Sequence, residues 1–215
     1  MIKTKLDSKE VTDYMGKIYR QSGDLRPFFT TVVPVIHGSV VANFRKGGRP
    51  KKWAAHSPWT RKVRAKTLSK HGLGQDILQA SGKMYRSLGN VKRIRRDTLH
   101  WGIGGVVYAA MQHYGGTIRP KSGKYLTLPF PGVTGRARDY KDTFFRGKVM
   151  FQSRGKGKPK PLFLLMRSVT IPARPFMMFQ TRDIDNITNY AAAYFLDPEG
   201  AKRVAARLPK GGYGT

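Results

Sequence analysis

A nearly uncharged stretch, Tyr108–Gly116, lies in the middle of a chain that is otherwise rich in lysine and arginine. Tyr108 and Met111 share one helical face at this spacing, and a glycine directly after the last periodic residue commonly ends a helix. The preceding segment, Leu99–Gly105, has the pattern of a strand that ends in a glycine turn. This order of strand, turn, short helix and glycine exit predicts a core helix beneath a β-sheet.

Composition excludes several kinds of site. The 215 residues allow one large domain with extensions, and an apolar fraction of 40% suffices for a core. The chain has no cysteine, which excludes disulfides and thiolate metal sites, and its five histidines are too scattered for a metal pair. No uninterrupted apolar run reaches membrane-spanning length, and no signal-peptide core follows the first lysines. We therefore expect no membrane and no cofactor, and synthesis in the cytoplasm.

The charge balance is the strongest compositional signal. Lysine and arginine number 41 against 12 acidic residues, which gives a formal net charge of +29. A chain of this charge attracts polyanions and acidic protein surfaces. Attraction to phosphate does not depend on base sequence, so the charge predicts no sequence-specific recognition.

Two helices are predicted at the start of the chain. Residues 8–23 begin with a possible capping Ser8 and end at Gly23. A second helix is expected from near Asp24, with Pro27 tolerated in its first turn and an apolar stripe from Phe28 to Phe44. The basic segment 49–74, which has no acidic residue, follows.

Two tryptophans in this basic segment have two readings. Trp53 and Trp59 could stack on the bases of single-stranded nucleic acid. Alternatively, they anchor a solvated loop to the core. The second reading is favoured because Ser57-Pro58, which lies between them, is typical of a turn before a helix start.

The second half of the chain reads mainly as strands. A hairpin is expected over 90–96 and 99–104, and the strongest strand, 162–170, runs into the proline-rich segment Ile171–Phe176. The basic loop 153–160 lacks the spacing of a P-loop; it is either a mobile finger that contacts DNA or an acidic neighbour, or a solvated hairpin tip. The other expected elements are a helix over 76–88, strands over 125–129 and 144–152, and a helix over 183–195 that packs on the sheet.

These elements predict an α+β fold: a mostly antiparallel sheet packed by N-terminal and C-terminal helices, with long basic loops and a flexible C-terminal arm. The expected division is an N-terminal arm over 1–23, a main domain over 24–196 and a basic tail over 197–215 that is at best partly ordered.

Four short motifs, in this order along the chain, resemble the Mu-type phage virion morphogenesis proteins, also described as tail completion or head–tail joining proteins. They are Lys52-Trp53 with Ser57-Pro58 and Thr60, then Ile77–Gly82, then Tyr108-Ala-Ala through Gly115-Gly116, and finally Ile171–Phe176. The resemblance covers roughly residues 20–196. The residues that carry it as a structural motif are Trp53, Tyr108, Ala109, Gly115, Gly116, Ile171, Pro172, Arg174, Pro175 and Phe176.

The resemblance implies a structural, non-enzymatic virion protein at the phage neck, which completes the tail and joins it to the head. Relatives form or join rings around the DNA channel, often sixfold, so a homo-oligomeric ring such as a hexamer is expected. Its partners would be connector or adaptor proteins and tail-tube proteins. The protein would be assembled into the virion in the host cytoplasm. The candidate contacts to DNA or an acidic partner are Arg61, Lys62, Arg64, Arg136, Arg138, Arg154, Lys156, Lys158 and Lys160.

Two other function classes were weighed. The charge also fits a sequence-independent nucleic-acid-binding protein that acts outside a virion, with salt-sensitive binding by the monomer. A hydrolase is disfavoured because His113 has no carboxylate nearby in sequence. The close acid pairs Asp139/Asp142 and Asp183/Asp185 lie in a basic loop and at a helix start, where capping explains the second pair.

Overall fold

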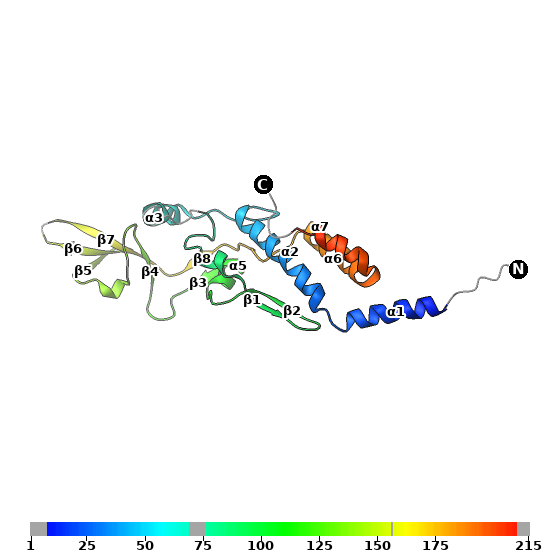
Figure 1. Cartoon of the computed structure of the whole chain (residues 1–215). Coiled ribbons are helices and arrows are strands. Elements are labelled where there is room, and N and C mark those ends of the chain that lie inside the picture. The colour runs from blue at the N-terminus through cyan, green and yellow to red at the C-terminus, as the bar shows by residue number, and fades with distance from the viewer. Residues whose placement is uncertain (1–7, 69–75, 156, 210–215) are drawn as a thin grey trace. The chain divides into compact units, whose positions relative to one another are not determined.

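The computed structural model describes residues 8–68, 76–155 and 157–209 (Figure 1). The chain forms two compact units, each built from separated segments. We call residues 1–50, 87–105 and 177–215 the helical unit, and residues 51–86 and 106–176 the sheet unit. All strand pairs in the described parts are antiparallel, which confirms the predicted α+β class. The domain boundaries expected after residues 23 and 196 stay predictions.

The helical unit begins with the two expected helices, α1 (Ser8–Ser22) and α2 (Arg26–Arg45). Asp24 Oδ1 accepts a hydrogen bond from the Arg26 amide at 3.0 Å, which satisfies one of the unpaired donors at the start of α2. The expected hairpin is confirmed as β1 (Leu88–Ile94) and β2 (Leu99–Ile103), closed by a bond from Arg95 N to Thr98 O of 2.8 Å.

Helix α2 has the length and apolar composition of a membrane span: its most apolar 18 residues have a mean hydropathy of 1.3. Half of these residues are buried within the unit, as is usual for the core helix of a folded domain. Such a helix, alone and near the N-terminus, is weak evidence for a membrane.

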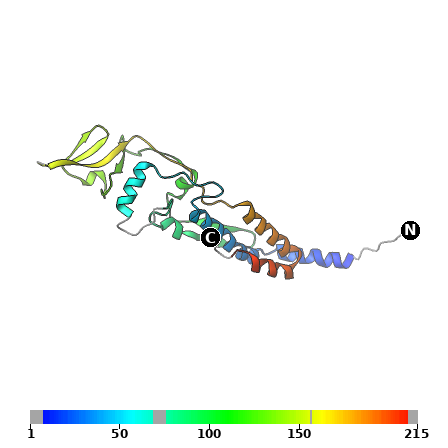
Figure 2. The same cartoon turned by 90° about the horizontal axis from the view of Figure 1, so that it is seen from above.

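Two C-terminal helices complete this unit. Helix α6 (Thr181–Leu196) and helix α7 (Pro198–Arg207) lie side by side in both views (Figures 1 and 2). Phe28 of α2 stacks on Tyr190 of α6, with ring centroids 5.4 Å apart and an interplanar angle of 5°. The buried residues of this core are Val32, Val35, Tyr190, Ala201 and Leu208.

Two expectations about this end of the chain were wrong. Helix α6 packs on α1, α2 and α7 rather than on a sheet, because the apolar stripe of α2 supplies its partner. The flexible arm expected over 197–215 is a helix over 198–207, and residues 210–215 of that arm lie outside the described residues. Ala201, Val204, Ala205 and Leu208 recur at helical spacing among basic residues, and this narrow apolar stripe packs on the core.

The sheet unit contains a four-stranded sheet in the order β4 (Leu126–Pro129), β7 (Gly157–Met166), β6 (Val149–Arg154), β5 (Thr143–Arg146). Its core comprises Val133, Met150, Leu162 and Phe163. The single strand expected over 144–152 is instead the β5–β6 hairpin, because Gly147, with φ of 60°, turns the chain. The loop expected over 153–160 is also mostly strand, since β7 begins at Gly157.

A smaller sheet pairs β3 (Gly116–Ile118) with β8 (Val169–Ile171). The strand expected over 162–170 breaks after Met166, and its two parts therefore join different sheets. The described part of this unit contains the α-helices α3 (Pro58–Leu68), α4 (Lys83–Arg86) and α5 (Ala109–Tyr114).

Two helix predictions in this unit need correction. The helix expected over 76–88 is reduced to α4, because Leu78 and Gly82 adopt φ values of 66° and 65° that no α-helix allows. The helix predicted at Tyr108–Gly116 exists as α5 and stops at Gly115. However, α5 buries no residue fully, so it is not the core helix that the pattern suggested.

Candidate functional site

The motif segments of the sheet unit meet around α5. The β3–β8 ladder places Gly116 opposite Ile171, and Arg174 N donates to Gln112 O at 2.9 Å. Gly115 has φ of 72°, and a Cβ there would lie 2.6 Å from Ala173 N. Only glycine therefore fits this close approach between α5 and the segment after β8.

The aromatic residues of α5 divide between two environments. The sequence also predicts that Tyr108 and Tyr114 pack against Ile171–Phe176. Tyr108 does line one cavity together with Ile171 and Pro172. Tyr114 is 78% exposed and contacts the ring of His113 instead, so the expectation was wrong for this residue.

The basic segment before α3 is anchored to the same region. Trp53 is buried, and its Nε1 donates to Pro175 O at 3.3 Å. Arg174 Nε and Nη2 donate to Ala54 O at 3.2 and 3.1 Å. Trp59 is half-buried with its ring edge against Phe130, at a centroid distance of 4.7 Å. These contacts agree with the anchoring reading of the tryptophans.

Helix α3 begins where Ser57-Pro58 predicted. Ser57 Oγ accepts from Thr60 N at 3.2 Å, which is the usual N-cap interaction. This start directs Arg64, two turns later, towards a cavity of about 540 Å³ that α3, α5 and β8 help to line.

The cavity holds two arginines and a histidine. Arg64 Nη1 lies 2.6 Å from His56 Nε2 and donates to Asp76 O at 3.1 Å. Arg174 Nη1 donates to Gln112 Oε1 at 3.2 Å. Burial, and then the positive charges of Arg64 and Arg174, lower the pKa of His56 to about 4. His56 is therefore neutral at pH 7 and can accept the hydrogen bond from Arg64.

The comparison with known families decides the class of protein. The model of the phage virion morphogenesis family matches residues 6–196, which span the described chain from α1 to the last residue of α6. The chain belongs to the phage virion morphogenesis family. No match was found among curated proteins or among solved structures.

Membership in the phage virion morphogenesis family confirms the resemblance found in the four motifs. It supports a role in virion assembly, association with the virion and interaction with other virion proteins. The match ends before α7, although α7 packs on the core of the helical unit.

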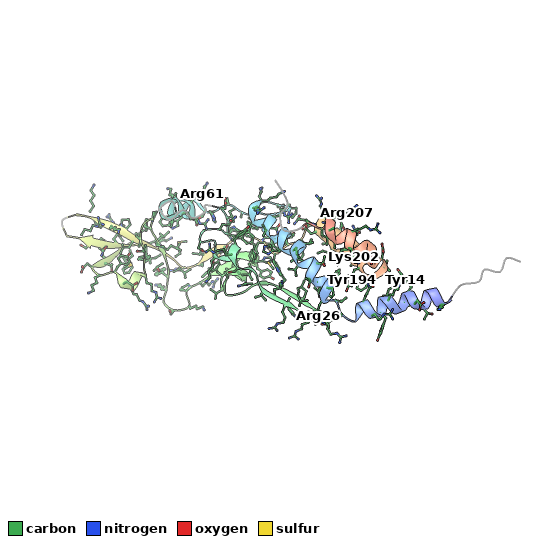
Figure 3. The ribbon with its side chains drawn as sticks, viewed as in Figure 1. Tyr14, Arg26, Arg61, Tyr194, Lys202 and Arg207 are labelled. Atoms are coloured by element: carbon green, nitrogen blue, oxygen red, sulfur yellow. The ribbon has the colours of Figure 1, made fainter. Side chains whose placement is uncertain are left out.

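The family match does not test the predicted cationic contacts, which the structure separates into three places. Arg61 and Lys62 are exposed on α3, where Figure 3 labels Arg61, whereas Arg64 of the same helix lines the cavity. Arg136 and Arg138 are exposed at the 3₁₀ turn Ala137–Asp139. At the β6–β7 tip, Arg154 and Lys158 are exposed, Lys160 is half-buried, and Lys156 lies outside the described residues.

Sequence reasoning missed a buried network in the helical unit. Asp183 Oδ2 accepts from Gln180 N at 2.9 Å, as its expected capping role requires. The same carboxylate accepts from the Ser39 hydroxyl and lies 3.7 Å from Arg49 Nη2. Ser39 and Asp183 are 144 residues apart, so no local pattern signals their contact.

The cavity was missed for the same reason. Arg64 was expected to contact DNA or an acidic partner, and Arg174 to belong to a structural motif, but their shared cavity had no signal in the spacing. Across the described residues, no three histidine or acidic side chains gather in a way that could hold a metal ion.

Proposed function

We propose that this protein is a structural component of the phage neck, which completes the tail and joins it to the head as a ring around the DNA channel. The observation that carries this proposal is the family match over residues 6–196. A net charge of +29 suits a subunit placed between packaged DNA and acidic protein surfaces. The protein would act by binding, without catalytic turnover.

The exposed cations fit a role in which no bases are read. Arg61 and Lys62 on α3, and Arg154 and Lys158 at the β6–β7 tip, present positive charge to solvent. Such side chains neutralise phosphates in any sequence, or pair with carboxylates of a neighbouring subunit.

Particles made without this protein test the proposal. Electron microscopy should show separate heads and tails, or tails of irregular length, and the wild-type protein supplied in trans should restore joined particles. Normal, infectious particles made without the protein would contradict a neck function.

The ring is tested on the purified protein. Its mass in solution should correspond to a closed oligomer, alone or with connector or tail-tube proteins, at low and at high salt. A protein that stays monomeric with every one of these partners would contradict a ring.

The charge also favours a second candidate, a sequence-independent nucleic-acid-binding protein that acts outside the virion. This candidate requires tight binding of duplex or single-stranded DNA by the monomer, with an affinity that falls steeply as salt rises. Tight DNA binding by a monomer that does not recognise tail tubes would favour it over the neck function.

A further inference from the structure

The cavity of the sheet unit combines positive charge with an apolar wall. Arg64 and Arg174 line it, and apolar side chains such as Leu78, Met84 and Ile171 form part of the same wall. Its volume of about 540 Å³ lies in the ordinary range for ligand sites.

No carboxylate balances the two guanidinium groups within this wall. None of the described residues that line the cavity is aspartate or glutamate. The chain has no acidic residue from 49 to 75, and Asp76, which follows, accepts from Arg64 through its main-chain oxygen. The acceptors seen at Arg174, Ala54 O and Gln112 Oε1, are neutral. Among the described residues of the wall, no acidic side chain therefore offsets the positive charge of the two arginines.

Hydrogen bonds within the sheet unit hold both arginines in place. Arg174 is only 5% exposed, and its three named hydrogen bonds use three of its five N–H groups. Arg64 is oriented by His56 and by Asp76 O. Burial and the nearby charge of Arg64 both lower the pKa of Arg174, so an anion here would relieve an existing electrostatic cost.

We propose that this cavity binds the carboxylate of an acidic segment from another virion protein. An aspartate or glutamate side chain accepts hydrogen bonds from guanidinium groups in a planar geometry, while neighbouring apolar residues of the segment pack on the apolar wall. The virion-assembly role supplies only the identity of the partner; the chemistry of the cavity does not depend on a position at the neck.

The recess argues against duplex DNA as the ligand. A double helix is far too wide to enter a cavity of this volume, whereas the carboxylate at the end of a glutamate side chain is narrow enough to enter it. Duplex contacts instead suit exposed cations such as Arg61 and Lys62.

Peptide titration of the purified full-length protein tests the site. The probes are a blocked peptide of alternating glutamate and leucine, the matched glutamine–leucine peptide, inorganic phosphate and a short DNA duplex. The glutamate peptide should bind about tenfold or more tightly than the glutamine peptide, since bonds to charged groups are the stronger ones.

Two variants locate the binding. Arg64→Gln should reduce affinity for the glutamate peptide by about tenfold. Arg61→Gln removes the same charge from an exposed position of the same helix and should change that affinity by less than about threefold, the scale of a surface ion pair. Ala80→Met occupies the cavity without altering charge, and it should also weaken binding. Circular dichroism confirms that each variant is folded.

Several outcomes overturn the carboxylate site. Equal binding of the two peptides, or equal losses in Arg61→Gln and Arg64→Gln, would show that net charge alone attracts the peptide. If inorganic phosphate binds and the protein does not prefer the glutamate peptide to the glutamine peptide, the cavity is a site for small anions. Loss of duplex binding in Arg64→Gln but not in Arg61→Gln would make it a DNA site. These measurements use the isolated protein. Their result would therefore remain valid even if the particle experiments contradicted the neck function.

Discussion

The two units differ in the surroundings of their buried and half-buried arginines. In the helical unit, Arg49 lies 3.7 Å from Asp183, whose side chain is 2% exposed, and both contact Ser39. In the sheet unit, Arg64 and Arg174 line one cavity whose described wall has no acidic residue. Removing either member of a buried ion pair leaves the other charge buried without its counter-ion, which destabilises the fold. At the proposed carboxylate site, the two cavity arginines would instead attract an anion from a partner.

The largest expected effect is that of removing the buried carboxylate. Asp183→Asn leaves Arg49 without its charged partner and should lower the free energy of unfolding by about 3 kcal/mol, as in other broken buried pairs. Chemical denaturation measures it. Asp185→Asn removes the same charge from an exposed position of α6 and should cost less than about 0.5 kcal/mol. If both variants lower the free energy of unfolding equally, the buried contacts of Asp183 contribute nothing to stability beyond its charge.

A direct comparison of the two kinds of arginine comes next. Arg49→Gln should destabilise the protein by about 2–3 kcal/mol, because Asp183 would stay buried without its counter-ion. Arg64→Gln loses the hydrogen bonds to His56 and Asp76 O but relieves repulsion with Arg174, and should change stability by less than about 1 kcal/mol. Equal costs in the same denaturation experiment would remove the distinction between the two units.

A smaller effect is expected from pH. The pKa of His56 is lowered to about 4 in the folded protein, so the unfolded chain, near 6.5, binds this proton more tightly. Its contribution to stability is complete above pH 6.5 and is lost as pH falls from 6.5 towards 4. Thermal unfolding should show this decline.

Two variants test whether His56 causes the loss of stability between pH 6.5 and 4. His56→Gln should make the unfolding temperature less dependent on pH between 6.5 and 4. His100→Gln, at an exposed position of β2, retains His56 and should keep the decline. If His56→Gln leaves the pH dependence unchanged, burial and the charges of Arg64 and Arg174 do not lower the pKa of His56 as stated.

Local patterns predicted most of the regular elements. The apolar stripe from Phe28 to Phe44, with Pro27 in the first turn, identified α2, and Ser57-Pro58 identified the start of α3. Strand ends were harder. The β5–β6 hairpin was read as one strand because its flanks are continuously apolar and only Gly147 marks the turn. Likewise, β7 and β8 were joined because strand propensity does not reveal which sheet a strand enters.

The sequence by itself determined the α+β class, the net charge, the positions of α1, α2, α5 and α6, and the motifs of a phage virion morphogenesis protein. These features depend on neighbouring residues or on composition. Only the tertiary structure decided that α6 and α7 pack on α2, that Asp183 neutralises Arg49, and that Arg64 and Arg174 share a cavity. These contacts join residues up to 144 positions apart, and their energies arise from burial and charge, which the chain acquires only on folding.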